Sequence, residues 1–187
     1  MKQLFKVITF GNTAILILNF KSGSTLTSSS PGYAATDPYP VNNTINITID
    51  SNYSKQATDI AILTTIIHES FHAYYVYLFN DPSTREKAIE EFGQQFGTDG
   101  GAQHDYMVTT YINSIASYLQ EYCVFKGYNI SRDYLAWSGL TGTAAFQRLS
   151  YNDKKRITDR CLAEITINNY PDNPEIRKGK NPCIVVL

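Results

Sequence analysis

The stretch 57-ATDIAILTTIIHESFHAYYVYLF-79 decides the fold, because it joins a long apolar run to a cluster of histidine and glutamate. Asn80-Asp81-Pro82 follows it, and proline disfavours helical backbone in the residue before it, so the pattern predicts a helix over residues 57–79. Burying imidazole and carboxylate groups costs free energy unless they are paired. The helix therefore raises the question of what pairs with His68, Glu69 and His72.

The spacing of these three residues indicates a metal site. His68 and His72 are i and i+4 on the helix, so both side chains lie on one face, a turn apart. Both imidazoles can then reach one Zn²⁺ ion at about 2.0–2.1 Å. Glu69 lies one position round the helix, where it can reach a water molecule as a general base; this is the H-E-x-x-H pattern. The flanks are too apolar for a solvated face, which disfavours a chance pair of surface histidines.

A third ligand is expected, because a catalytic zinc usually has three protein ligands and keeps a fourth position for water. The chain has three histidines, so His104 is the predicted third ligand. It follows GTDGGAQ (residues 97–103), a predicted glycine-rich loop that can bring it towards the first helix. Asp105, Glu90 and Glu91 are competing ligands, and Asp105 is also a predicted partner that orients the ligand set.

Hydrolysis at such a site needs a donor for the negative charge that develops on the carbonyl oxygen. The 14 tyrosines offer candidates on a helix predicted over residues 105–126. At the helical period, Tyr111 falls about 20° from the face of His104. Tyr118 falls about 40° from that face, and Tyr122 falls on it. Tyr111 is the predicted donor because it is nearest along the helix, with packing in the core as the competing interpretation.

The N-terminal part of the chain predicts a small sheet. LFKVITF and AILILNF flank Gly11-Asn12, which is typical of a hairpin and a better interpretation than a signal peptide. Residues 22–40 are rich in Ser, Thr, Gly and Pro, so they predict a flexible loop. Residues 44–50 alternate isoleucine with polar residues, which predicts a half-buried strand.

The rest of the chain predicts helices. Residues 83–96 form a polar helix with a Ser83 cap and Glu86 at the capping-box spacing. Gly127 is expected to cap the helix over residues 105–126. Two short helices and one longer one follow, and residues 171–187 form a tail. Strands followed by helices indicate an α+β fold, predicted as one domain over residues 1–187.

Composition limits the partners. The formal net charge is −1 and the sequence pI is about 6.3, so there is no basic excess of the kind that nucleic-acid binding requires. No apolar run approaches the roughly 18 residues of a membrane span, so no transmembrane segment is predicted. The oligomeric state is left open.

With HESFHAYY and QHDYM in place, the chain resembles the zincin metallopeptidases, which carry H-E-x-x-H on a helix behind a small sheet. TIIHESFHAYY, HDYM and YLAWSGL together resemble metallopeptidase domains at the C-terminal ends of large bacterial secreted or toxin-like proteins. This resemblance covers roughly residues 40 to 160. It implies secretion, or delivery as part of a larger bacterial protein.

The resemblance implies a zincin-like fold, with zinc held by His68 and His72 and with Glu69 as the base. It also implies that a peptide or protein substrate pairs with an edge strand, expected to be the strand over residues 44–50. The metzincin extension H-E-x-x-H-x-x-G-x-x-H is absent. The predicted third ligand lies 32 residues after His72, farther than in many short zincins.

The leading hypothesis is a zinc metallopeptidase, and two alternatives stay open. One is a non-catalytic module, either stabilised by zinc or a degenerate zincin that binds a partner. Structural zinc sites commonly fill all four positions, often with cysteines, and none of the three cysteines lies near the motif. The other alternative is a metal-dependent amide hydrolase or toxin domain that acts on a non-protein substrate, because H-E-x-x-H does not by itself select the amide.

Overall fold

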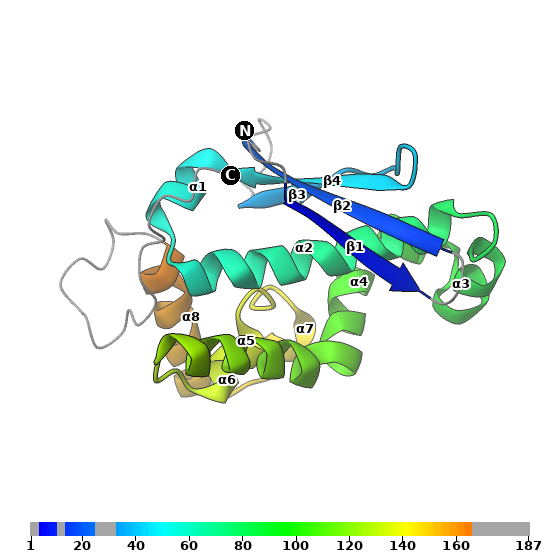
Figure 1. The fold of residues 1–187 in the computed structure, drawn as a ribbon. Coiled ribbons are helices and arrows are strands. Elements are labelled where there is room, and N and C mark those ends of the chain that lie inside the picture. Colours follow the sequence, from blue (N-terminus) through cyan, green and yellow to red (C-terminus); the bar gives the residue numbers. More distant parts are fainter. Residues whose placement is uncertain (1–3, 11–13, 25–32, 166–187) are drawn as a thin grey trace. The chain divides into compact units, whose positions relative to one another are not determined.

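The computed structural model describes residues 4–10, 14–24 and 33–165, and this part of the chain is mixed α+β, mostly helical with a small sheet (Figure 1). The chain divides into two compact units. The sheet unit holds the described residues up to 52 together with 68–103, and the helical unit holds 53–67 together with the described residues from 104 onward. The predicted α+β class is confirmed, whereas the assignment of a single domain stays a prediction.

The sheet has four strands in the order β1-β2-β4-β3. β1 (Leu4–Phe10) pairs antiparallel with β2 (Ala14–Gly23), which confirms the predicted hairpin, although its turn residues lie outside the described residues. β2 pairs in parallel with β4 (Thr44–Asp50), and β4 pairs antiparallel with β3 (Ala34–Thr36). β4 is thus an interior strand, so its prediction as the edge strand was wrong; among the described strands, β1 and β3 are the edges.

One face of the sheet is apolar and buried. Ile45, Ile47 and Ile49 of β4 are buried, as their alternation predicted. The matching residues of β2 are opposite them, with Leu18 beside Ile45 and Phe20 beside Ile47. Period-two patterning in two neighbouring strands therefore builds the sheet side of the core.

The predicted loop over residues 22–40 is partly a strand. Residues 25–32 lie outside the described residues, but Ala34–Thr36 forms β3. A tight two-residue turn closes the chain between Val41 and Thr44, with reciprocal backbone hydrogen bonds of 2.8 and 2.9 Å. Its central residues, Asn42 and Asn43, both have positive φ, which asparagine tolerates better than most residues. A three-residue strand is too short for its periodicity to be detected.

The predicted long helix is α2 (Asp59–Asn80), preceded by α1 (Ser51–Gln56). Two shorter helices and a 3₁₀ turn follow: α3 (Arg85–Phe92), η1 (Gln94–Gly97) and α4 (Gly100–Tyr106). The predicted Ser83 cap was wrong, because Thr84 precedes the helix without a side-chain cap bond. The Ser83 hydroxyl instead donates to Asp81 at 2.6 Å.

An aromatic cluster joins the second half of α2 to η1. Tyr75 is fully buried, and its ring centroid lies 5.0 Å from that of Phe96. The rings of Phe79 and Phe92 both stack on the ring of Phe96, and the centroids of Phe92 and Phe96 lie 4.8 Å apart. A Cβ at Gly97 would lie 2.8 Å from the Phe79 ring, so only glycine allows this close approach. The cluster holds the η1 backbone against α2.

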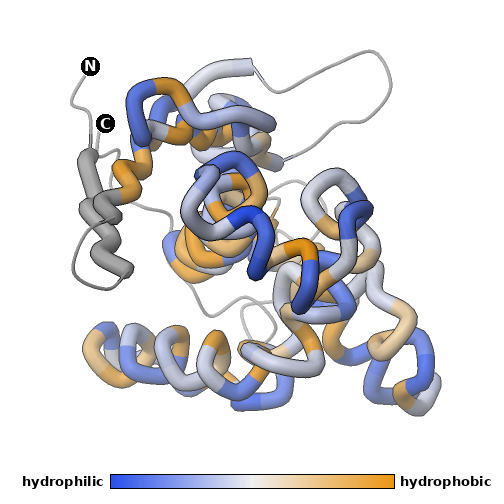
Figure 2. The backbone as a smooth tube through the Cα atoms, turned by 90° about the vertical axis from the view of Figure 1, so that its right-hand side faces the viewer, coloured by the Kyte–Doolittle hydropathy of each residue, from blue (hydrophilic) through white to orange (hydrophobic). Residues whose placement is uncertain are grey.

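The helical unit departs from the predicted single helix over residues 105–126. The segment is the end of α4, then a π-helical turn η2 (Met107–Tyr111), then α5 (Ile112–Lys126). Gly127 adopts the left-handed conformation with φ of 71°, which confirms the predicted C-cap. The two short helices and the longer one are also confirmed as α6 (Arg132–Trp137), α7 (Ala144–Gln147) and α8 (Tyr151–Ile165). Figure 2 shows hydrophobic and hydrophilic residues alternating along the helices.

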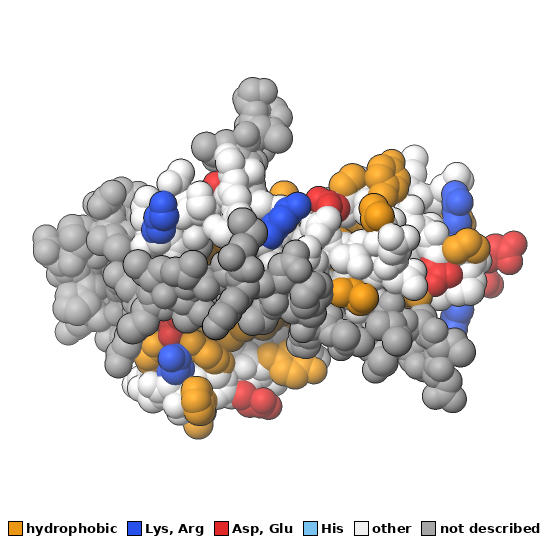
Figure 3. Space-filling view, turned by 45° about the horizontal axis from the view of Figure 1, so that its top comes forward, with side chains coloured by type: hydrophobic (Ala, Val, Ile, Leu, Met, Phe, Trp, Pro, Cys, Tyr) orange, Lys and Arg blue, Asp and Glu red, His pale blue; other side chains and the backbone are white. Residues whose placement is uncertain are grey.

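On the face drawn in Figure 3, charged side chains of both signs lie among the described residues, and several acidic and basic ones gather at the right-hand end of the view. Within the described ranges, no helix combines the length and the apolar character that crossing a membrane requires.

Candidate metal centre

The two motif histidines of α2 turn their Nε2 atoms towards each other. The atoms lie 3.0 Å apart, and the ring centroids are separated by 4.7 Å with the planes at 70°. The predicted common face for His68 and His72 is therefore confirmed. Two ligand atoms bound tetrahedrally to one zinc ion at the usual distances lie about 3.3 Å apart. The pair is thus close to the separation that a shared metal ion needs.

The third histidine joins them. Ligand atoms of His68, His72 and His104 all lie within 4.8 Å of one another, and all three side chains are half-buried. Among the residues that the structure describes, this trio is the group of histidine, cysteine and acidic side chains that could hold a metal ion. His104 lies in the last turn of α4, so its expected position after a loop was wrong. A helix start at Gly100 replaces part of that loop.

The competing third ligands do not belong to this group. Glu90 and Glu91 of α3 are exposed, and so is Asp105 of α4. The residue that contacts a motif histidine is instead Gln103, whose Oε1 lies 2.6 Å from Nδ1 of His72. Gln103 is 5% exposed, which makes it a buried polar side chain beside the metal candidates.

The environment of His72 favours its neutral form. Burial lowers the pKa of His72 below its ordinary value, and the hydrogen bond with Gln103 offsets part of this change. Burial acts in this direction because it penalises the charged imidazolium. The neutral imidazole is the form that binds a metal ion, so the local environment suits the predicted ligand role.

Glu69 contacts the edge strand. The Thr36 hydroxyl lies 2.6 Å from Oε2 of Glu69 and 3.2 Å from its backbone carbonyl oxygen. The hydroxyl has one proton, so it donates chiefly to the nearer carboxylate oxygen. Glu69 is outside the group of metal-binding candidates. Its role as a base stays a prediction, and β3 is the strand that positions it.

The three tyrosines proposed as oxyanion donors differ in exposure and in their contacts. Tyr118 is 62% exposed, and the Tyr122 hydroxyl donates to Asp59 at 2.9 Å, so Tyr122 already has an acceptor. Burial raises the pKa of Tyr122 above its ordinary value. Tyr111 is half-buried at the end of η2, with its ring 5.9 Å from that of Tyr106. The role of Tyr111 as oxyanion donor stays a prediction.

Sequence reasoning missed two residues of this site. Gln103 precedes His104 directly, so a polar residue beside a candidate ligand was the available signal. Thr36 offered none, because its contact with Glu69 spans 33 positions and depends on a strand that periodicity did not reveal.

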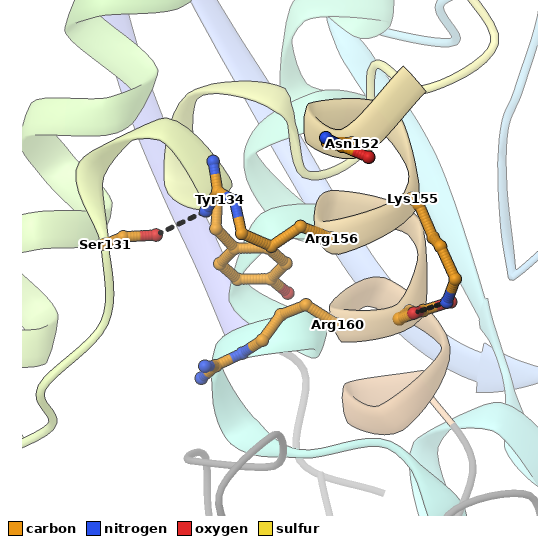
Figure 4. A pocket seen from close by; sticks show the side chains of 7 residues that line it. Ser131, Tyr134, Asn152, Lys155, Arg156 and Arg160 are labelled. Carbon is orange, nitrogen blue, oxygen red and sulfur yellow. Dashed lines mark hydrogen bonds and ion pairs between the residues drawn. The ribbon is translucent and has the colours of Figure 1, made fainter. Parts of the chain in front are cut away.

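A hollow lies in the helical unit, and none of the three histidines lines it (Figure 4). Its lining is polar, with three cations among its members: Ser131, Tyr134, Asn152, Lys155, Arg156, Asp159 and Arg160. Each cation has an acidic partner, and Lys155 forms an ion pair with Asp159. Arg156 contacts Asp133 and Asp153, and Arg160 contacts Glu164. These cations are neutralised within the chain, so the hollow is not a strong anion site.

No family model, curated protein or solved structure matches this chain. The site must therefore be interpreted from its own geometry.

Proposed function

We propose that the chain is a zinc-dependent metallopeptidase with a zincin-like sheet unit. The observation that carries the proposal is the convergence of His68, His72 and His104, whose ligand atoms lie within 4.8 Å. Three histidines leave one position of a tetrahedral ion open, which is typical of catalytic rather than structural zinc. The same count disfavours the alternative of a purely structural zinc module.

The three histidines would hold the metal, and a bound zinc ion would polarise the scissile carbonyl and acidify water. Glu69 is the proposed base: its carboxylate takes a proton from the attacking water as the new C–O bond forms. The same carboxyl then delivers this proton to the leaving nitrogen as the C–N bond breaks. The products are a carboxylic acid and an amine, so atoms and charge balance.

Thr36 is proposed to orient the base. Its hydroxyl donates to Oε2 of Glu69 at 2.6 Å and so restricts the orientation of the carboxylate. Thr36 also ends β3, an edge of the sheet as described. We therefore assign substrate strand pairing to β3 in place of the interior strand β4, because only an edge strand has backbone groups available for an added strand.

The test has two stages. Elemental analysis of the purified chain is expected to find about one zinc per chain, because three histidine ligands suffice for a catalytic site. A peptide library then provides the substrate, with Glu69→Gln as the matched variant. This variant is expected to keep zinc and to lose turnover by at least about 100-fold.

Three results would contradict parts of the proposal. If the chain binds no metal after incubation with zinc at neutral pH, the proposed metal site is wrong. A Glu69→Gln variant as active as the wild type removes the base. Zinc without any peptide cleavage favours the non-catalytic module or a non-protein amide substrate.

A further inference from the structure

We propose that Gln103 is a positioning residue that holds the proton of His72 on Nδ1 and so turns the lone pair of Nε2 towards the metal. This inference rests on the proposed function for its purpose, but its geometry stands without a metal.

The orientation of the Gln103 amide follows from one contact. The side-chain Nε2 of Gln103 lies 2.7 Å from the carbonyl oxygen of Phe96. A carbonyl oxygen can only accept a hydrogen bond, so the amide NH₂ group must face Phe96. Oε1 of Gln103 then faces His72, at 2.6 Å from Nδ1.

The tautomer of His72 follows from that orientation. Oε1 has no proton, so the Nδ1 atom that contacts it must be the donor. A neutral imidazole with its proton on Nδ1 has a lone pair on Nε2. That atom is the one that lies 3.0 Å from Nε2 of His68. Gln103 therefore selects the ring form in which His72 can serve as a ligand through Nε2.

The Phe96 carbonyl, which accepts the bond from Gln103, belongs to a closely packed residue. Phe96 is 6% exposed and packs against Tyr75, Phe79 and Phe92. The close approach at Gly97 fixes the same turn. Packing of η1 thus orients an amide, and the amide orients an imidazole.

Glutamine suits this place better than a carboxylate for two reasons. A neutral amide costs less free energy to bury than a charged group, and Gln103 is buried. The amide also donates to one neighbour and accepts from the other, whereas a carboxylate would face the Phe96 carbonyl without a proton to share. Because Gln103 directly precedes His104 on α4, one turn of this helix supplies both a ligand and the residue that prepares another ligand.

Three variants separate positioning from simple packing. Gln103→Met removes both hydrogen bonds at similar volume. Gln103→Glu keeps the acceptor towards His72 and loses the donor towards Phe96. Gln95→Met makes the same change at an exposed position of η1 and serves as the matched control.

The first measurement is the tautomer of His72, by long-range ¹H–¹⁵N NMR of the metal-free full chain at a pH where its histidines are neutral. The wild type, Gln103→Glu and Gln95→Met are expected to hold the proton on Nδ1. Gln103→Met is expected to show a mixture of tautomers, because the Gln103 oxygen that accepts this proton is then lost. A wild-type chain with its proton on Nε2 would overturn the proposal without any variant.

The second measurement is zinc affinity, by competition with a chelator of known affinity. Gln103→Met is expected to bind zinc about 10–100-fold more weakly than the wild type. Gln103→Glu keeps the acceptor towards His72 and is expected to recover most of the wild-type zinc affinity. Equal losses in both variants would mean that zinc affinity depends on the bond to Phe96, which both variants lack, and not on the acceptor towards His72, and would overturn the positioning role. If the wild type has the predicted tautomer but binds no zinc, the proposed function fails while the tautomer assignment stands.

Discussion

The start and the middle of α2 carry polar clusters of opposite kinds. At the start of the helix, Asp59 accepts hydrogen bonds from the hydroxyls of Tyr122 and Tyr128 at 2.9 and 2.8 Å, and Lys126 lies 3.7 Å away. Nine residues along, His68 begins a cluster in which imidazole nitrogens converge on one another. The first cluster neutralises its charge within the chain, whereas the second brings together atoms that a cation would join.

The buried carboxylate of Glu164 in the helical unit is also paired within the chain. Glu164 is fully buried, yet Arg160 donates to one of its oxygens at 2.9 Å and Thr58 donates to the other at 2.7 Å. Burial of a charge therefore does not by itself mark a functional site. What distinguishes the histidine cluster is the chemistry of its atoms, because three imidazole nitrogens that could bind a metal ion lie together, and no carboxylate of the described residues belongs to the group.

The largest expected effect tests the buried ion pair of Arg160 and Glu164. Arg160→Met should destabilise the fold by about 3–5 kcal/mol, since it leaves the buried Glu164 carboxylate without its cation. Urea unfolding measures the change. Lys155→Met on the same helix is the matched control, because its ion pair with Asp159 is more exposed and should contribute at most about 1 kcal/mol. Similar small losses in both variants would show that the buried pair is not special.

The next effect tests the histidine cluster. His72→Ala should weaken zinc binding by at least about 100-fold, more than the loss of an outer contact usually causes, because it removes a ligand. Competition with a chelator measures the affinity. Tyr122→Phe, which removes a hydrogen bond to Asp59, should leave zinc affinity unchanged. An unchanged affinity in His72→Ala would show that His72 is not a ligand.

A smaller effect concerns the base. Thr36→Val should lower kcat by about tenfold while zinc affinity stays the same, since the hydroxyl orients the Glu69 carboxylate without contacting the metal. Thr36→Ser keeps a hydroxyl and should recover most of the rate. Wild-type kcat in the valine variant would remove the proposed role of Thr36.

The smallest effect returns to Asp59. Tyr122→Phe should cost about 1 kcal/mol of folding stability, because Asp59 keeps Tyr128 and Lys126 as partners. Thermal and urea unfolding measure it. Tyr118→Phe, at an exposed position of the same helix, should change stability by much less. Equal effects in the two variants would contradict the importance of the Asp59 contact.

Local pattern predicted the parts of the site that lie within one turn. His68 and His72 share a face because the helical period places them there, and α2 has nearly the predicted bounds. The hairpin, the strand over residues 44–50 and the Gly127 cap were also predictable, since each depends on a few neighbouring residues. The grouping of His104 with the motif agrees with its prediction as a ligand.

Errors arose wherever the outcome depended on distant partners. Strand order made β4 interior, and a strand's period of two does not reveal its neighbours. Asp105 was the expected partner of the ligand set, but Gln103 took that place because α4 begins earlier than the glycine-rich segment suggested. Ser83 does not cap the helix, because its hydroxyl donates a hydrogen bond to the Asp81 carboxylate.

The sequence by itself determined the α+β class, the long apolar helix and the placing of two imidazoles and a carboxylate on a single turn. These follow from backbone periodicity, which acts over a few residues. Only the tertiary structure decided that Thr36 contacts Glu69, that Gln103 contacts His72, and that β3 is an edge of the sheet. Those contacts join residues about 30 positions apart, and they form because packing of the sheet and of the aromatic cluster brings their backbones together.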